Sequence, residues 1–146
     1  MLKKEEKIEM SREGSVDIFV RETAGQYYSN SLNLKDRTKN FGISVLRFLS
    51  RLPNKQPYTA INNQLSRCST SVGANYRASQ RAKSTSDFIY KLKIVEEECD
   101  ETIYFLEILQ ELMPDEGRDI RSIIKEGEEI LAIIVKSIKT AKSRMR

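Results

Sequence analysis

The chain of 146 residues has no histidine, no tryptophan and only two cysteines. Histidine is the commonest general base in enzymes and the commonest side-chain ligand of transition metals. We therefore expect no catalytic residue, no metal site, no cofactor and no enzymatic activity. Cys68 and Cys99 do not form a C-x-x-C pair, and both fall on apolar positions of a helical pattern. This placement predicts buried free thiols in a reducing cytoplasm rather than a redox pair.

Long apolar runs and glycine-rich phosphate loops are missing too. No stretch approaches the roughly 18 to 20 apolar residues that span a membrane, and no signal-peptide core follows the charged amino terminus. Neither G-x-x-x-x-G-K-[ST] nor G-x-G-x-x-G occurs in the chain. We therefore expect a cytoplasmic protein with no membrane partner and no small-molecule substrate.

Four segments carry apolar side chains at the alternating three- and four-residue spacing of amphipathic helices. Short connections join these segments, so they bury one another most simply as an antiparallel up-down-up-down four-helix bundle. The sequence thus predicts an all-α fold, with a bundle domain over residues 32–146 and a partly disordered N-terminal extension over residues 1–31. Within the extension, residues 15–29 could form an arm that docks on another surface. The expected helices run from about Asn33 to Leu52, Tyr58 to Ala82, Ser84 to Met113 and Ile120 to Ala141.

The second predicted helix presents an unusual number of small residues. Gly73 and Ala74 let a neighbouring helix approach closely, which predicts tight packing against this face. Asn75 falls on the expected buried stripe, where a polar side chain can fix helix register or partner choice. A ligand-binding role for Asn75 is the alternative interpretation.

Charge is sorted along the chain, although the formal net charge is only +4. Residues 34–83 carry ten basic and one acidic side chain, residues 84–117 carry two basic and ten acidic, and residues 118–146 carry eight basic and four acidic. In one interpretation the acidic third helix neutralises its basic neighbours within one bundle. In the other, a basic side and an acidic side meet head to tail between copies, and such a contact closes into a ring where its rotation permits.

The third predicted helix holds the densest group of carboxylates. Glu97, Glu98 and Glu101 lie near one another at helical spacing, and we expect them to pair with Arg67, Arg77 or Arg81. A hard cation such as Mg²⁺ would also accept oxygen ligands. Carboxylate metal sites in helical bundles add histidines from partner helices, however, and this chain has none.

Two motifs carry a resemblance to a known family. Residues 70–78 read Thr-Ser-Val-Gly-Ala-Asn-Tyr-Arg-Ala, and residues 96–101 read Glu-Glu-Glu-Cys-Asp-Glu. Together they resemble the signature of the bacterial four-helix bundle proteins encoded by intervening sequences in 23S rRNA genes. The resemblance extends from about Leu34 to Lys142, with Cys99 where alanine is usual and Phe105 where tryptophan is common.

The resemblance implies a four-helix fold and a homo-oligomer, often a pentamer. A related branch, the accessory variability proteins of diversity-generating retroelements, associates with a reverse transcriptase and its RNA. We therefore predict an oligomeric accessory protein that binds RNA or a ribonucleoprotein. The alternative is a structural scaffold without nucleic-acid affinity, which would be favoured if the carboxylates of residues 96–101 consumed the basic side chains. The predicted nucleic-acid-binding residues are Arg77, Arg81, Lys83, Lys136, Lys139, Lys142, Arg144 and Arg146.

Overall fold

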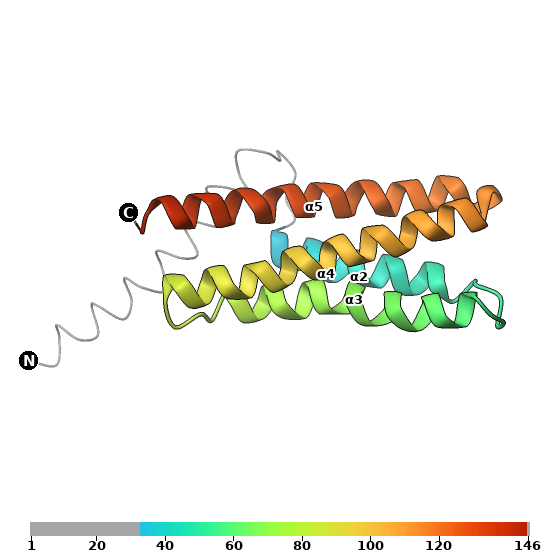
Figure 1. The fold of residues 1–146 in the computed structure, drawn as a ribbon, viewed down its shortest axis with the longest axis horizontal. Helices are drawn as coiled ribbons and strands as arrows, with labels where there is room; N and C mark the ends of the chain where they lie inside the picture. The colour runs from blue at the N-terminus through green and yellow to red at the C-terminus, as the bar shows by residue number, and fades with distance from the viewer. Residues whose placement is uncertain (1–32, 146) are drawn as a thin grey trace, which may run out of the picture.

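The structure, a computed structural model, describes residues 33–145 and shows four long helices in that range (Figure 1). Consecutive helices run antiparallel, so the predicted all-α four-helix bundle is confirmed. The extension predicted for residues 1–31 lies outside the described residues, as does Arg146. The elements are α2 (Leu34–Leu49), α3 (Tyr58–Ser79), α4 (Thr85–Leu112), the short 3₁₀ helix η1 (Pro114–Glu116) and α5 (Gly117–Ser143).

Two of the helices begin with a side-chain cap. The Asn33 side chain accepts a hydrogen bond from the backbone N–H of Asp36 at 2.9 Å, and Ser84 accepts one from Asp87 at 3.1 Å. Each cap satisfies a backbone donor that has no partner within its helix. The carboxylate of Asp87 also accepts from the backbone N–H of Lys83 at 3.0 Å, one residue before the cap, so it satisfies a further backbone donor at the start of α4.

Two helices end earlier than the periodicity predicts. The N–H of Leu52 bonds to the carbonyl of Leu49, and the N–H of Ala82 bonds to that of Ser79. These three-residue bonds belong to tight 3₁₀-type turns, so α2 and α3 end before the last apolar residue of their stripes. Pro53 reinforces the first of these ends because it disfavours the helical conformation of the residue before it.

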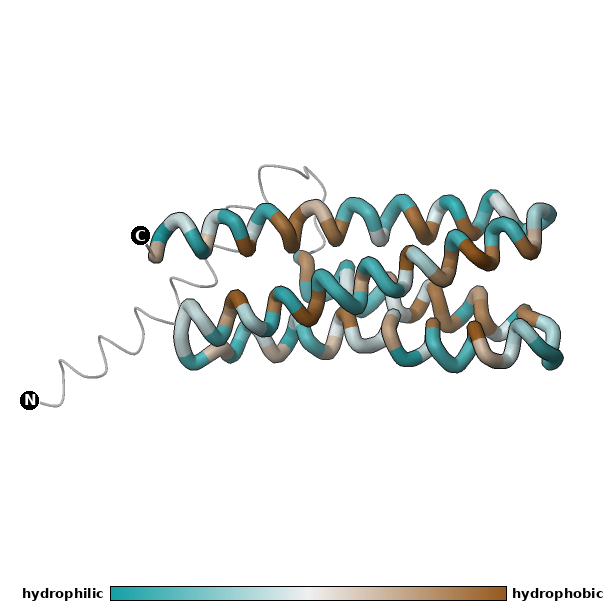
Figure 2. Tube along the Cα trace, viewed as in Figure 1, coloured by the Kyte–Doolittle hydropathy of each residue, from teal (hydrophilic) through white to brown (hydrophobic). Residues whose placement is uncertain are grey.

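The four apolar stripes meet in one core (Figure 2). The main contacts join α2 to α3, α3 to α4, α4 to α5 and α5 to α2, so α2 and α4 lie on opposite sides of the bundle. Gly127 of α5 marks a close crossing, because a Cβ there would lie 3.1 Å from both Phe41 and Ile103. Among residues 33–145, none of the helices combines the length and apolarity that crossing a bilayer requires.

The helices differ in length, which shapes one end of the bundle. At 1.5 Å per residue, the 16 residues of α2 span about 24 Å and the 27 residues of α5 about 40 Å. Because α2 is the shortest, α5 continues past the start of α2 towards its own carboxyl end (Figure 1).

Candidate nucleic-acid interface

The antiparallel order gathers basic side chains at one end of the bundle. The end of α3, the α3–α4 connection and the carboxyl end of α5 lie at the same end in Figure 1. Residues far apart in the sequence, such as Arg81 and Lys142, therefore share that end. The predicted residues found there are Arg77, Arg81, Lys83, Lys136, Lys139, Lys142 and Arg144.

We call Arg81, Lys83, Lys139 and Lys142 the basic end, because all four are exposed. Within residues 33–145, none of these four side chains forms an ion pair with a carboxylate. Lys136 is half-buried, and Arg144 is exposed beside them. Lys142 also lies in the last turn of α5, where a cation is stabilised by the helix dipole.

The first carboxylate of α4, that of Asp87, forms its ion pair with Lys91, and the charge of Lys83 acts on it only as a smaller effect. Lys91 binds the Asp87 carboxylate at 2.5 Å. The hydrogen bond from Lys91, followed by that from the backbone N–H of Lys83, lowers the pKa of Asp87 below its ordinary value. Asp87 is therefore ionised and paired within its own helix near neutral pH.

Three of the carboxylates of residues 96–101, those of Glu96, Glu98 and Glu101, form ion pairs further along the bundle. Arg67 of α3 contacts Glu98 at 3.2 Å and Glu101 at 2.7 Å, so the predicted pairing of Arg67 is present. Glu97 does not take part in this pairing with Arg67, because its side chain is exposed and forms no ion pair among the described residues. Glu96 binds Lys93 of its own helix at 2.7 Å. Among residues 33–145, therefore, none of these carboxylates forms an ion pair with Arg77 or Arg81. In the part of the chain that the structure describes, no group of three acidic or thiol side chains lies close enough together to hold a metal ion.

The predicted place of Asn75 on the buried stripe is wrong. From Val72 the core continues by four residues to Tyr76, which is buried, whereas Asn75 is half-buried. The side-chain amide of Asn75 donates to the carbonyl of Ser71 at 2.9 Å, so it is satisfied within its own helix. Steps of three and of four both fit a helical period, which is why the pattern alone could not distinguish the two positions.

The small-residue face of α3 packs against α2 as expected, although Gly73 and Ala74 differ in role. A Cβ on Gly73 would lie 3.3 Å from the carbonyl oxygen of Thr38, and one on Gly42 would lie 3.1 Å from that of Ser69. Backbone therefore meets backbone at this crossing. Ala74 is exposed and lies outside the crossing.

A groove runs along the outside of the crossing, and sequence reasoning missed it. Two of its basic residues, Lys35 and Lys39, were not among the predicted binding residues, although their four-residue spacing places them on one side of α2. We call this surface the α2–α3 groove. Its lining is formed by Lys35, Asp36, Thr38, Lys39, Gly42, Ile43, Leu46, Ser69, Thr70, Gly73, Ala74 and Arg77.

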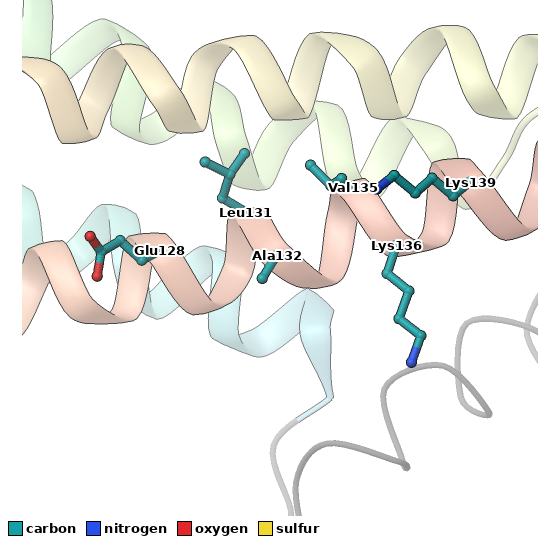
Figure 3. Close-up of a pocket in the computed structure, with 6 residues that line it drawn as sticks. All are labelled: Glu128, Leu131, Ala132, Val135, Lys136 and Lys139. Atoms are coloured by element: carbon teal, nitrogen blue, oxygen red, sulfur yellow. The ribbon is translucent and has the colours of Figure 1, made fainter.

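A second hollow lies on α5 beside the basic end (Figure 3). Leu131, Ala132 and Val135 form its aliphatic part, and Glu128, Lys136 and Lys139 border it. No aromatic ring lines this hollow among the described residues. The exposed aromatic ring near this end is that of Tyr90, which lies less than two turns after Ser84 and is 66% exposed.

Comparisons with known proteins agree with the fold. The sequence profile of the 23S rRNA-intervening sequence protein family matches residues 30–136, so Lys139 and Lys142 lie beyond the matched region. A crystal structure of a protein with unknown function from the S23 ribosomal protein family of Bacteroides thetaiotaomicron VPI-5482 is 33% identical, with a TM-score of 0.68. That match covers 73% of this chain and 98% of the other. No curated protein matches significantly. Since the profile spans most of the chain and the structural match spans nearly all of its relative, the chain belongs to the 23S rRNA-intervening sequence protein family.

Proposed function

We propose that this protein is a non-enzymatic, self-associating accessory protein that binds RNA or a ribonucleoprotein through its basic end. The observation that carries the proposal is the exposure of four cations at one end of the bundle without carboxylate partners among the described residues. Four carboxylates of α4, those of Asp87, Glu96, Glu98 and Glu101, pair with Lys91, Lys93 and Arg67 instead. The family's association with intervening sequences of 23S rRNA supports RNA as the ligand class.

The proposed binding is dominated by phosphate contacts. Lysine and arginine side chains that neutralise phosphates release condensed counterions, so the affinity falls steeply as salt rises. A homo-oligomer, a pentamer by resemblance, presents several copies of the basic end, and weak contacts then add through multivalency. Stacking of a base on Tyr90 would be tolerant of sequence, because every base offers a flat face. A ribonucleoprotein ligand, such as a reverse transcriptase with its RNA, would present the same phosphates.

The alternative function is a protein-interaction scaffold without nucleic-acid affinity. The exposed cations then serve only solubility and the helix dipole, as Lys142 already does in part. The two functions differ in whether the location of the cations matters. A scaffold gains nothing from cations at one end rather than the other, whereas an RNA-binding surface does.

The test is a binding titration of a structured RNA at low salt with three proteins. One is the wild type, and one carries glutamine in place of Arg81, Lys83, Lys139 and Lys142. The matched control carries glutamine in place of Arg47, Lys55, Arg118 and Arg121, which are exposed at the other end and lose the same total charge. The proposal expects binding by the wild type and the control, and markedly weaker binding by the basic-end variant. No binding by the wild type, or equal losses in both variants, would favour the scaffold.

A further inference from the structure

Once the internal ion pairs are assigned, exposed carboxylates remain on one side of the bundle. Glu97, Asp100, Glu107 and Glu111 of α4 are exposed and form no ion pair among the described residues. Their spacing places them on the outer side of α4, around Tyr104, which is 57% exposed. We call these four carboxylates and Tyr104 the α4 stripe. A large exposed aromatic ring is typical of the centre of a contact surface, and the carboxylates around it give this surface a charge that a basic partner surface can complement.

The complementary surface is the α2–α3 groove. Lys35, Lys39 and Arg77 line its basic part together with one carboxylate, that of Asp36, so its charge is net positive. None of the three cations forms an ion pair among the described residues. Ile43 and Leu46 form its apolar part, and Leu46 is 40% exposed. Between the basic part and the apolar part of the groove, α2 and α3 cross closely at Gly42 and Gly73. Only small side chains lie there, so a helix of a partner can lie close to both α2 and α3.

The two surfaces cannot meet within one chain. The groove lies on α2 and α3, whereas the stripe lies on α4, which is on the opposite side of the bundle from α2. A contact between them therefore requires two copies. Because each copy would contribute a different surface, the contact is heterologous and generates a closed ring or an open chain.

We infer that the α4 stripe of one copy docks in the α2–α3 groove of the next. The lengths agree, since the stripe from Glu97 to Glu111 spans about 21 Å and the groove from Lys35 to Leu46 about 17 Å. Charge complementarity aligns the carboxylates with the groove lysines, and the ring of Tyr104 contacts the apolar part. Phosphates of RNA would use only the basic part of the groove, and they would leave Ile43 and Leu46 exposed.

This inference rests on the self-association part of the proposed function and assigns residues to it. It places Arg77 in the contact between copies and leaves Arg81, Lys83, Lys139 and Lys142 for RNA. The two activities thus use separate surfaces and can be lost separately.

The experiment is light scattering after size exclusion at micromolar concentration, with charge-reversal variants of exposed residues. The wild type should have a mass several times 16.9 kDa. The groove variant Lys35→Glu/Lys39→Glu and the stripe variant Glu107→Lys/Glu111→Lys should each associate more than about tenfold more weakly, because like charges then face each other. A single chain carrying all four substitutions should regain the wild-type mass, because the reversed surfaces are again complementary.

The matched control is Arg118→Glu/Arg121→Glu, which lies outside both surfaces and should keep the wild-type mass. Far-ultraviolet circular dichroism of each variant verifies that the bundle is folded. A monomeric wild type, or assembly that survives both single-surface reversals, would overturn the inference. Assembly that survives both reversals leaves RNA binding by the basic end untouched, whereas a monomeric wild type would also remove the multivalent part of that binding. A failed RNA titration would leave the contact between copies standing.

Discussion

The guanidinium of Arg37 in α2 donates two hydrogen bonds to the carboxylate of Glu126 in α5. Its Nε donates to Oε1 of Glu126 at 2.9 Å, and a terminal guanidinium nitrogen donates to Oε2 at 2.7 Å. The same terminal nitrogen also binds Glu129 at 2.9 Å. The Arg37 side chain is only 12% exposed. α2 packs less extensively against α5 than against α3, so this clamp joins the least extensive of the four neighbouring helix pairs.

Replacing Arg37 with glutamine should destabilise the bundle by about 2 kcal/mol, because it removes charge-assisted bonds and leaves two half-buried carboxylates together. Arg67 also binds two carboxylates but is 52% exposed, so solvent screens its ion pairs and Arg67→Gln should cost clearly less stability than Arg37→Gln. Urea unfolding of both variants measures the difference. Equal losses would show that the burial of Arg37 adds nothing to its clamp.

Replacing Gly42 with alanine should destabilise the protein by roughly 1 to 3 kcal/mol, because the new Cβ would lie 3.1 Å from the backbone oxygen of Ser69. Gly73→Ala should act in the same direction. Gly117→Ala is the control, since its Cβ would meet only the flexible end of Arg121, at 3.2 Å. Alanine is favoured over glycine within a helix, so this control should be neutral or stabilising. Thermal unfolding that ranks Gly117→Ala as the most harmful would contradict the close crossing of α2 and α3.

Replacing Ser69 with alanine should leave stability unchanged or raise it. Within the described residues, the Ser69 hydroxyl is buried and has no hydrogen-bond partner. Removing an unsatisfied polar group removes its desolvation cost. Ser79 is the matched control, because its buried hydroxyl donates to the carbonyl of Tyr76 at 2.7 Å. Ser79→Ala should therefore be the less stable of the two variants in urea unfolding, and the reverse order would disprove the assignment.

The buried thiol of Cys99 should lower the free energy of unfolding at alkaline pH, relative to its value at neutral pH. Burial, and secondarily the charge of Asp100, raises the pKa of Cys99 from 9.0 to about 12. Above about pH 9 the thiol ionises in the unfolded chain but not in the folded one, so stability is lost as pH rises from 9 towards 12. The loss relative to Cys99→Ala is at most about 1.4 kcal/mol per pH unit. Urea unfolding of both proteins from pH 8 to 10.5 measures it, and parallel pH profiles would contradict the burial of the thiol.

Local signals in the sequence were enough to predict the helices, whereas relations between helices were not. The caps at Asn33 and Ser84 depend on residues three positions apart, so the sequence shows them directly. The choice between Asn75 and Tyr76 depends on which neighbour α3 faces, and both positions fit the helical period. The groove residues Lys35 and Lys39 were missed for the same reason, because the groove exists only once α2 lies against α3. Predictions for residues 1–31 stay untested, since the described residues begin at Asn33.

The salt dependence of RNA binding tests the central claim most directly. The affinity of the wild type, of the basic-end glutamine variant and of the opposite-end control is measured across a salt series. Each phosphate contact contributes about 0.7 to 0.9 to the slope of log affinity against log salt. Replacing Arg81, Lys83, Lys139 and Lys142 should therefore reduce that slope by about 3 per copy engaged, and the control should keep the wild-type slope. Identical slopes for the wild type and the basic-end variant would contradict RNA binding through this end.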